Sequence, residues 1–171
     1  MSHGYQQTVT YSFDDFIASF EDTPQNEAIG FGLNKHSSYS EITTTAKNKK
    51  LARTKENFEY KAVPSILMID FDPHPSGTPF ETAQDLLSCL KEVHPDFADC
   101  EVFAKGSVSS GLDGKAGGFH LYFPVPDGSD IPRFAEVLFC RLVIDGFGYI
   151  ALAKNGAKLL RAPIDGSVYT P

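Results

Sequence analysis

The strongest hydrophobic pattern in this chain is the apolar run Ile66–Asp72, which contains Asp70 and ends in Asp72. Its length and composition predict a buried strand. Because side chains alternate between the two faces of a strand, Ile69 and Phe71 are expected in the core. Asp70 and Asp72 are then expected together on the opposite face.

Shorter apolar runs predict further strands. Phe119–Phe123 is the clearest of them, and it places His120 and Tyr122 on one face. Other strands are expected at residues 101–105, 149–153 and 158–165, with short ones near 28–33 and 41–46. The pair Asn155-Gly156 is typical of a hairpin turn between the last two main strands.

Three helices are predicted from apolar residues at helical spacing. The first begins at Ser12, where a Ser-x-x-Asp pattern favours a helix N-terminus. The second is expected to begin at Thr78, with Pro79 and Glu81 completing a capping box. The third begins at Asp130.

This order of elements predicts an α+β fold. We expect a mostly antiparallel, palm-like sheet of the RRM or ferredoxin-like type, with helices on one face and polar side chains on the other. Residues 1–60 are expected to form a small N-terminal α/β unit packed on a core at 61–171. That core is expected to be the fragment of a longer protein.

Charge changes the picture of possible partners. The 171 residues carry a net charge of −7, which argues against a free-standing, tight nucleic-acid binder but not against an enzyme that holds nucleic acid weakly. The run 47–55 is locally basic. Its Lys49, Lys50 and Arg53 are candidates for contacts with nucleic acid, although a solvated loop is the simpler explanation.

The chain has neither a membrane-spanning apolar run nor the apolar core of a signal peptide at its start, so a cytoplasmic protein with no membrane contact is expected. Its cysteines, Cys89, Cys100 and Cys140, are far apart and odd in number. They predict reduced core thiols and no zinc site.

The two strand carboxylates are the first candidates for chemistry. Asp70 and Asp72 are expected roughly 6–7 Å apart, and at an effective dielectric of about 20 their repulsion is on the order of 2–3 kcal/mol. A divalent cation relieves that cost, and oxygen ligands favour Mg²⁺ or Mn²⁺. Arg161 and Asp165 share a face if their strand is regular, and they join His120 on the same side of the sheet.

Three motifs in this order resemble the archaeo-eukaryotic primase superfamily, in particular the primase and primase-polymerase domains of plasmids, phages and integrative elements. The first is the apolar strand ending in Asp-x-Asp at Ile66–Asp72. The second is the strand histidine after a Ser/Gly loop, at Ser107–His120. The third is the acidic residue after an apolar stretch, at Leu159–Asp165. The resemblance covers roughly residues 60–171.

The resemblance implies template-directed nucleotidyl transfer by a DNA primase, with or without polymerase extension. Asp70, Asp72 and Asp165 would be the catalytic residues and would hold two Mg²⁺ or Mn²⁺ ions, and His120 would contact the nucleotide phosphates. A single-stranded DNA template and an NTP or dNTP would be the substrates. A helicase or accessory domain outside this sequence would be a partner.

The chain departs from the family pattern at Gly118, where the family usually has Ser. The missing donor is expected from the Ser/Gly loop, from its backbone N–H groups or from a serine. Further candidate phosphate-binding residues are Ser107, Ser109, Ser110, Arg161, Lys105 and Lys115.

Each candidate also has a simpler explanation. Asp-x-Asp can be a solvated strand end, His120 can be a structural histidine, and Asp165 with Arg161 can be a surface ion pair. Tyr122 is expected either to stack on a base or to cover the sheet. His74 follows the Asp pair closely but lies in a Pro-rich turn, and His94 and His3 are expected to be incidental.

Other functions compete with the primase interpretation. A metal-dependent glycosyltransferase also uses Asp-x-Asp but does not need the later His and Asp motifs. A haloacid-dehalogenase-like phosphatase normally has Thr or Val where this chain has His74. A catalytically degenerate primase-like module would bind nucleotide or a single strand without chemistry.

Overall fold

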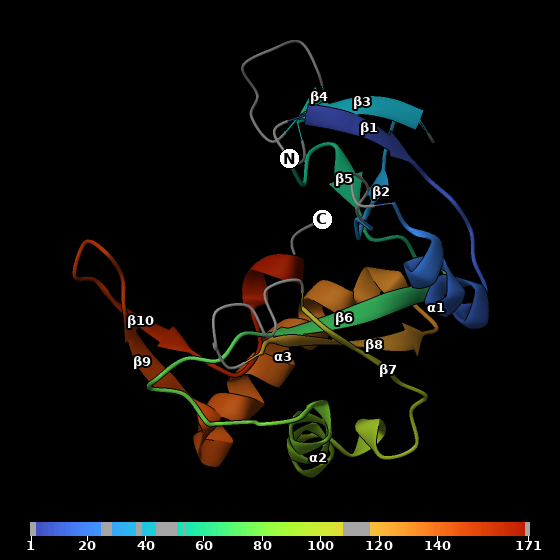
Figure 1. The fold of residues 1–171 in the computed structure, drawn as a ribbon. Coiled ribbons are helices and arrows are strands. Elements are labelled where there is room, and N and C mark those ends of the chain that lie inside the picture. The colour runs from blue at the N-terminus through green and yellow to red at the C-terminus, as the bar shows by residue number, and fades with distance from the viewer. Residues whose placement is uncertain are drawn as a thin grey trace.

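The computed structural model describes residues 3–24, 29–36, 39–43, 51–52, 54–107 and 117–169. These residues form helices and mainly antiparallel sheets, so the prediction of an α+β fold is confirmed (Figure 1).

A three-stranded antiparallel sheet is the centre of the molecule. Its strands are β6 (Ser65–Phe71), β8 (Phe119–Val125) and β7 (Phe103–Gly106), in the spatial order β6-β8-β7. Asp70 lies opposite His120 across the first pair, and Lys105 lies opposite His120 across the second. This register decides which side chains share a row on the sheet.

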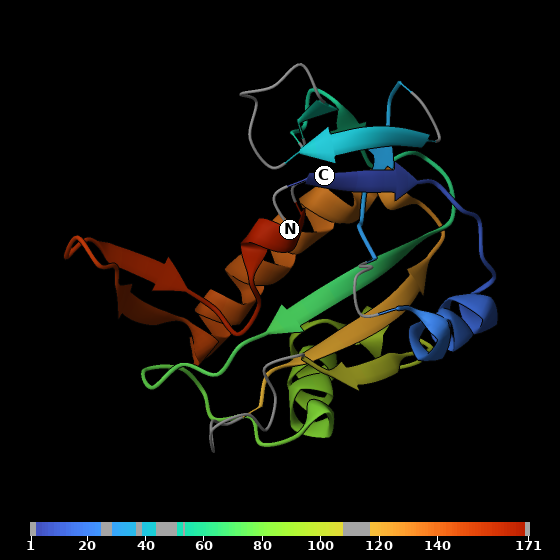
Figure 2. The same cartoon turned by 45° about the horizontal axis from the view of Figure 1, so that its top comes forward.

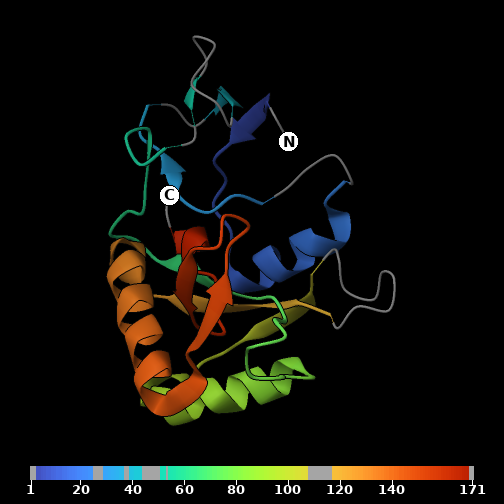
Figure 3. The same ribbon diagram turned by 90° about the vertical axis from the view of Figure 1, so that its left-hand side faces the viewer.

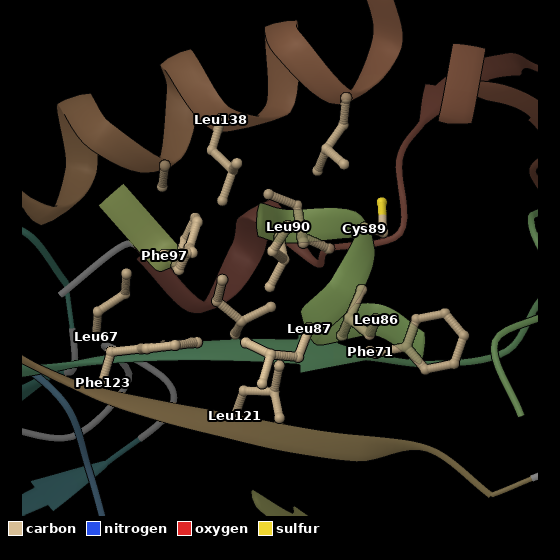
Figure 4. Packing of buried hydrophobic residues seen from close by; sticks show 14 of the residues in the cluster. Leu67, Phe71, Leu86, Leu87, Cys89, Leu90, Phe97, Leu121, Phe123 and Leu138 are labelled. Atoms are coloured by element: carbon tan, nitrogen blue, oxygen red, sulfur yellow. The ribbon is translucent and has the colours of Figure 1, made fainter. Parts of the chain in front are cut away.

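One face of this sheet packs against α2 (Ala83–Val93) and α3 (Ile131–Leu142), and Figure 4 shows the apolar side chains between them. Ile69 and Phe71 are buried there, as the alternation predicted. A short 3-10 turn, η1 (Pro95–Phe97), follows α2 and closes this side of the core. The main buried members are Leu67, Ile69, Phe71, Leu86, Leu90, Phe97, Leu121, Phe123, Leu138 and Leu142.

The opposite face is only partly polar. Figure 3 shows α1 (Phe13–Asp22) on one side of the sheet and α2 on the other. Phe16 and Phe20 of α1 contact Tyr122 at ring-centroid distances of 5.5 and 5.1 Å. The expected polar face is therefore wrong at the Tyr122 end, which α1 covers, and holds at the Asp70 end.

The N-terminal region contributes two small sheets. One is formed by β1 (His3–Gln7), β3 (Tyr39–Thr43) and β4 (Leu51–Ala52), and the other by β2 (Leu33–Asn34) and β5 (Phe58–Glu59). Phe58 of β5 is fully buried.

The last two strands form a separate hairpin of β9 (Tyr149–Leu152) and β10 (Lys158–Arg161), which projects from the body of the protein (Figure 2). Gly156 has a φ of 81°, so the predicted turn is confirmed. The predicted strand 158–165 is too long, because β10 ends at Arg161. Pro163, which lacks an N–H, cannot donate to a strand ladder.

Two of the three predicted helix starts are confirmed. Ser12 caps α1, accepting from the backbone N–H of Asp15, and Asp130 precedes α3. The expected start at Thr78 is wrong, because the capping box of α2 is formed by Thr82 and Asp85. The Thr-x-x-Asp pattern four residues later makes both reciprocal hydrogen bonds.

Two further predictions concern the cysteines and membrane-spanning helices. Cys89 is buried, and burial raises the pKa of its thiol to about 11, but Cys100 and Cys140 are exposed, so the prediction of three core thiols is wrong. Across the described segments, no helix combines the length and apolar character needed to cross a membrane.

Candidate functional site

A polar row crosses the central sheet at Asp70, His120 and Lys105. His120 Nε2 lies 3.1 Å from Asp70 Oδ1, and both side chains are about one-fifth exposed. Because a carboxylate only accepts, Nε2 carries the proton in this contact. The ammonium group of Lys105 lies 4.3 Å from the centre of the Phe20 ring, so Lys105 is held at the edge of the row by a cation–π contact.

Tyr122 contacts the second ring nitrogen of His120. Its hydroxyl lies 3.1 Å from His120 Nδ1, and burial raises the pKa of Tyr122 to about 12, so the phenol stays protonated. Both ring nitrogens of His120 are therefore held, which orients the imidazole. Tyr122 is 3% exposed, so it covers the sheet and is not a surface on which a base can stack.

A second row lies at the strand ends and consists of Asp72, Gly118 and Ser107. The N–H of Ser107 donates to the carbonyl of Gly118 at 2.9 Å. A Cβ atom at position 118 would lie 2.7 Å from Asp72 Oδ1, 2.7 Å from the carbonyl oxygen of Phe71 and 3.1 Å from Ser107 Oγ. The space that a side chain at 118 would fill is thus already occupied, which explains why glycine stands here. Ser107 is the described serine that this packing brings to the site.

Asp165 reaches the site through its backbone and not through the sheet. Its N–H donates to the carbonyl of Asp70 at 3.0 Å. Its carboxylate accepts from the N–H and the hydroxyl of Ser167, at 2.9 and 2.8 Å, which stabilises the start of η5 (Gly166–Tyr169). The expectation that Asp165 and Arg161 share the face of a regular strand is wrong, because the chain leaves β10 before Asp165.

The pKa of Asp72 responds to the charged groups around it. Partial burial raises the pKa of Asp72, as do the charges of Asp70 and Asp165, while His120 lowers it. Three acidic groups that repel one another form the oxygen-donor set that hard divalent cations take. The pairing of Asp70 with His120 and the backbone hydrogen bond from Asp165 to Asp70 bring the three motifs to one end of the sheet.

The geometry of this set is not that of a formed metal site. In the part of the chain that the structure describes, no group of three or more His, Cys, Asp or Glu side chains is placed to hold a metal ion. Asp70 contacts His120, and Asp165 contacts Ser167. A carboxylate offers about four acceptor positions, so these contacts leave capacity for a cation. The donor chemistry fits Mg²⁺ or Mn²⁺, and the three carboxylates would have to come closer together to share one.

Tyr149, which the sequence analysis did not single out, also borders the site. Tyr149 stacks on His74, with ring centroids 4.9 Å apart, and packs against Gly77. Arg161 lies opposite Tyr149 across the hairpin. Partial burial raises the pKa of Tyr149, Arg161 lowers it, and Asp165 and Asp72 raise it. The stack ties the loop after Asp72 to the hairpin.

An open pocket of about 280 Å³ lies beside this row of residues. It is lined by residues from the N-terminal end of α2, from β7 and from the start of β8, namely Glu81, Thr82, Ala83, Ala104, Lys105, Gly106, Gly117, Gly118 and Phe119. Gly118 is itself buried and forms part of the pocket wall.

The remaining candidates lie outside the described residues. They are Ser109, Ser110 and Lys115 in the Ser/Gly loop and Lys49, Lys50 and Arg53 in the basic run. Their roles stay predictions.

No family model, curated protein or solved structure matches this chain. The resemblance to primases consequently rests on the three motifs alone.

Proposed function

We propose that this chain is a metal-dependent nucleotidyltransferase domain of the primase type, which makes primers from NTPs or dNTPs on a single-stranded template. The observation that supports this most is geometric: His120 Nε2 lies 3.1 Å from Asp70 Oδ1 and the N–H of Asp165 donates to the Asp70 carbonyl at 3.0 Å, so three separate parts of the sequence meet at Asp70. The order of the motifs along the chain is the second support.

In this proposal Asp70, Asp72 and Asp165 hold the divalent ions. The ions would supply charge neutralisation and alignment for attack of a hydroxyl on the α-phosphate, with pyrophosphate as the leaving group. His120, oriented by Tyr122, has its Nε2 proton beside Asp70, where it can donate to a phosphate oxygen brought to that carboxylate. Ser107 is a further donor at the strand end.

Primer synthesis tests the proposal. The assay uses single-stranded DNA, labelled NTPs or dNTPs, and Mg²⁺ or Mn²⁺. Asp70→Ala and Asp72→Ala are expected to abolish product. Asp99→Ala, which removes an exposed carboxylate between η1 and β7, is the matched control and should retain activity. Full activity in either site variant would refute the assignment.

A second candidate is a module of the same type that binds nucleotide or a single strand without catalysis. It is favoured by the contacts that Asp70 and Asp165 make with His120 and Ser167 in place of a shared metal position. Equilibrium dialysis with labelled nucleotide, with and without Mn²⁺, separates the two candidates. Metal-dependent binding without product would support the module.

A further inference from the structure

We infer that the β9–β10 hairpin is the surface along which single-stranded nucleic acid lies as it enters the candidate site. This inference rests on the proposed function, and it assigns template binding to a hairpin that overlaps the motifs only at Leu159–Arg161 of its second strand.

The charge of the hairpin differs from that of the chain. Residues 146–164 contain Lys154, Lys158 and Arg161 and no Asp or Glu, whereas the whole chain has a net charge of −7. A segment of this kind on an acidic protein is complementary to a polyanion. Nucleic acid needs such a segment, because it draws much of its binding free energy from neutralised phosphates.

One face of the hairpin is also apolar and open to solvent. Directly opposed residues share a face, so the pairs Leu160–Ile150 and Lys158–Leu152 lie on the same side. Ile150 is 51% exposed, Leu152 72% and Leu160 51%. A single strand presents both phosphates and the apolar faces of unpaired bases, so this combination of lysine and apolar side chains suits it.

The base of the hairpin adjoins the candidate site. Arg161 and Tyr149 pair at that end, and Tyr149 stacks on His74, two residues after Asp72. Figure 2 shows the hairpin projecting beyond the end of β6 that carries Asp70. Tyr149 and Arg161 lie on the other face of the hairpin from Ile150 and Leu160, so a strand on the exposed face must pass round the base of the hairpin to reach the carboxylates. The positive charge of the hairpin favours nucleic acid over a second copy of the chain, because two such hairpins would repel each other.

Fluorescence anisotropy with labelled single-stranded dT20, in EDTA and without nucleotide, tests the hairpin independently of catalysis. The variant Lys154→Ala/Lys158→Ala is expected to raise Kd at least about tenfold at 50 mM salt. Its slope of log K against log salt should fall by about 1.4, since each lost phosphate contact on a single strand contributes about 0.7. Leu152→Asn should raise Kd severalfold and leave the slope unchanged.

The matched control is Lys91→Ala, at an exposed position in the last turn of α2. It should bind within about twofold of wild type, because α2 lies on the opposite side of the sheet. Wild-type protein that does not bind dT20, or a double variant that binds like wild type, would overturn the inference. So would a double variant that changes only the oligomeric state in sedimentation equilibrium, because the hairpin would then hold a second copy.

The same proteins in the primer assay separate this inference from the proposed function. Hairpin-dependent binding without primer synthesis would leave the inference standing and reject the proposed enzyme. Primer synthesis together with dT20 binding that does not depend on Lys154 and Lys158 would support the proposed enzyme and reject the inference.

Discussion

Gly118 offers the sharpest test of how the candidate site is packed. A Cβ atom at this position would lie 2.7 Å from both Asp72 Oδ1 and the carbonyl oxygen of Phe71. That is about 0.7 Å inside the 3.4 Å limit of ordinary contact. The Asp72 carboxylate can rotate away, but the Phe71 oxygen belongs to the backbone of β6 and can move only with the strand.

Gly118→Ala is therefore expected to destabilise the protein by about 1–3 kcal/mol, the usual cost of overpacking. For a chain of this length each kcal/mol lowers Tm by about 2–4 °C. Urea unfolding and a thermal melt measure the two quantities. Gly166→Ala is the matched control, because no atom lies within 4 Å of the added Cβ. It should change stability by less than about 1 kcal/mol.

A double-mutant cycle with Asp72→Ala then isolates the carboxylate. Removing Asp72 Oδ1 relieves one of the two closest contacts, so Gly118→Ala should cost less in the Asp72→Ala background than in wild type. Equal costs in both backgrounds would show that Asp72 does not lie against Gly118. A Gly118→Ala protein as stable as Gly166→Ala would refute the packing argument altogether.

Three further predictions follow from single contacts. Thr82→Ala should destabilise the protein by about 1 kcal/mol through loss of the α2 cap with Asp85, and Thr82→Ser should be nearly neutral in the same urea titration; equal losses would contradict the capping role. Because the folded pKa of Asp72 lies above its ordinary 3.8, wild-type stability should fall as pH rises from 3.8 through the raised value, and Tm measured against pH should lose this segment in Asp72→Asn. Tyr149→Ala should cost about 0.5–1.5 kcal/mol beyond the effect of lost burial by removing the stack on His74, whereas Tyr149→Phe should keep it; a Phe variant as unstable as Ala in thermal melts would count against the stack.

The primary sequence was sufficient for the elements with strong local signals. The alternation around Ile69 and Phe71 predicted which face of β6 is buried, since strand periodicity is a local property of the chain. Asn155-Gly156 predicted the hairpin turn for the same reason. The start of α2 was placed four residues too early, because Thr78 and Thr82 both begin a capping pattern and only the completed hydrogen bonds distinguish them.

The sequence by itself thus determined the strand that carries Asp70 and the strand that carries His120. It supplied only a hypothesis that a third acidic residue lies near both. The tertiary structure decided how Asp165 arrives, through a backbone hydrogen bond to Asp70 and not along a shared strand. It also decided that α1 buries Tyr122 and that Gly118 must lack a side chain. These facts depend on contacts between segments far apart in the chain, and local periodicity carries no information about which segments meet.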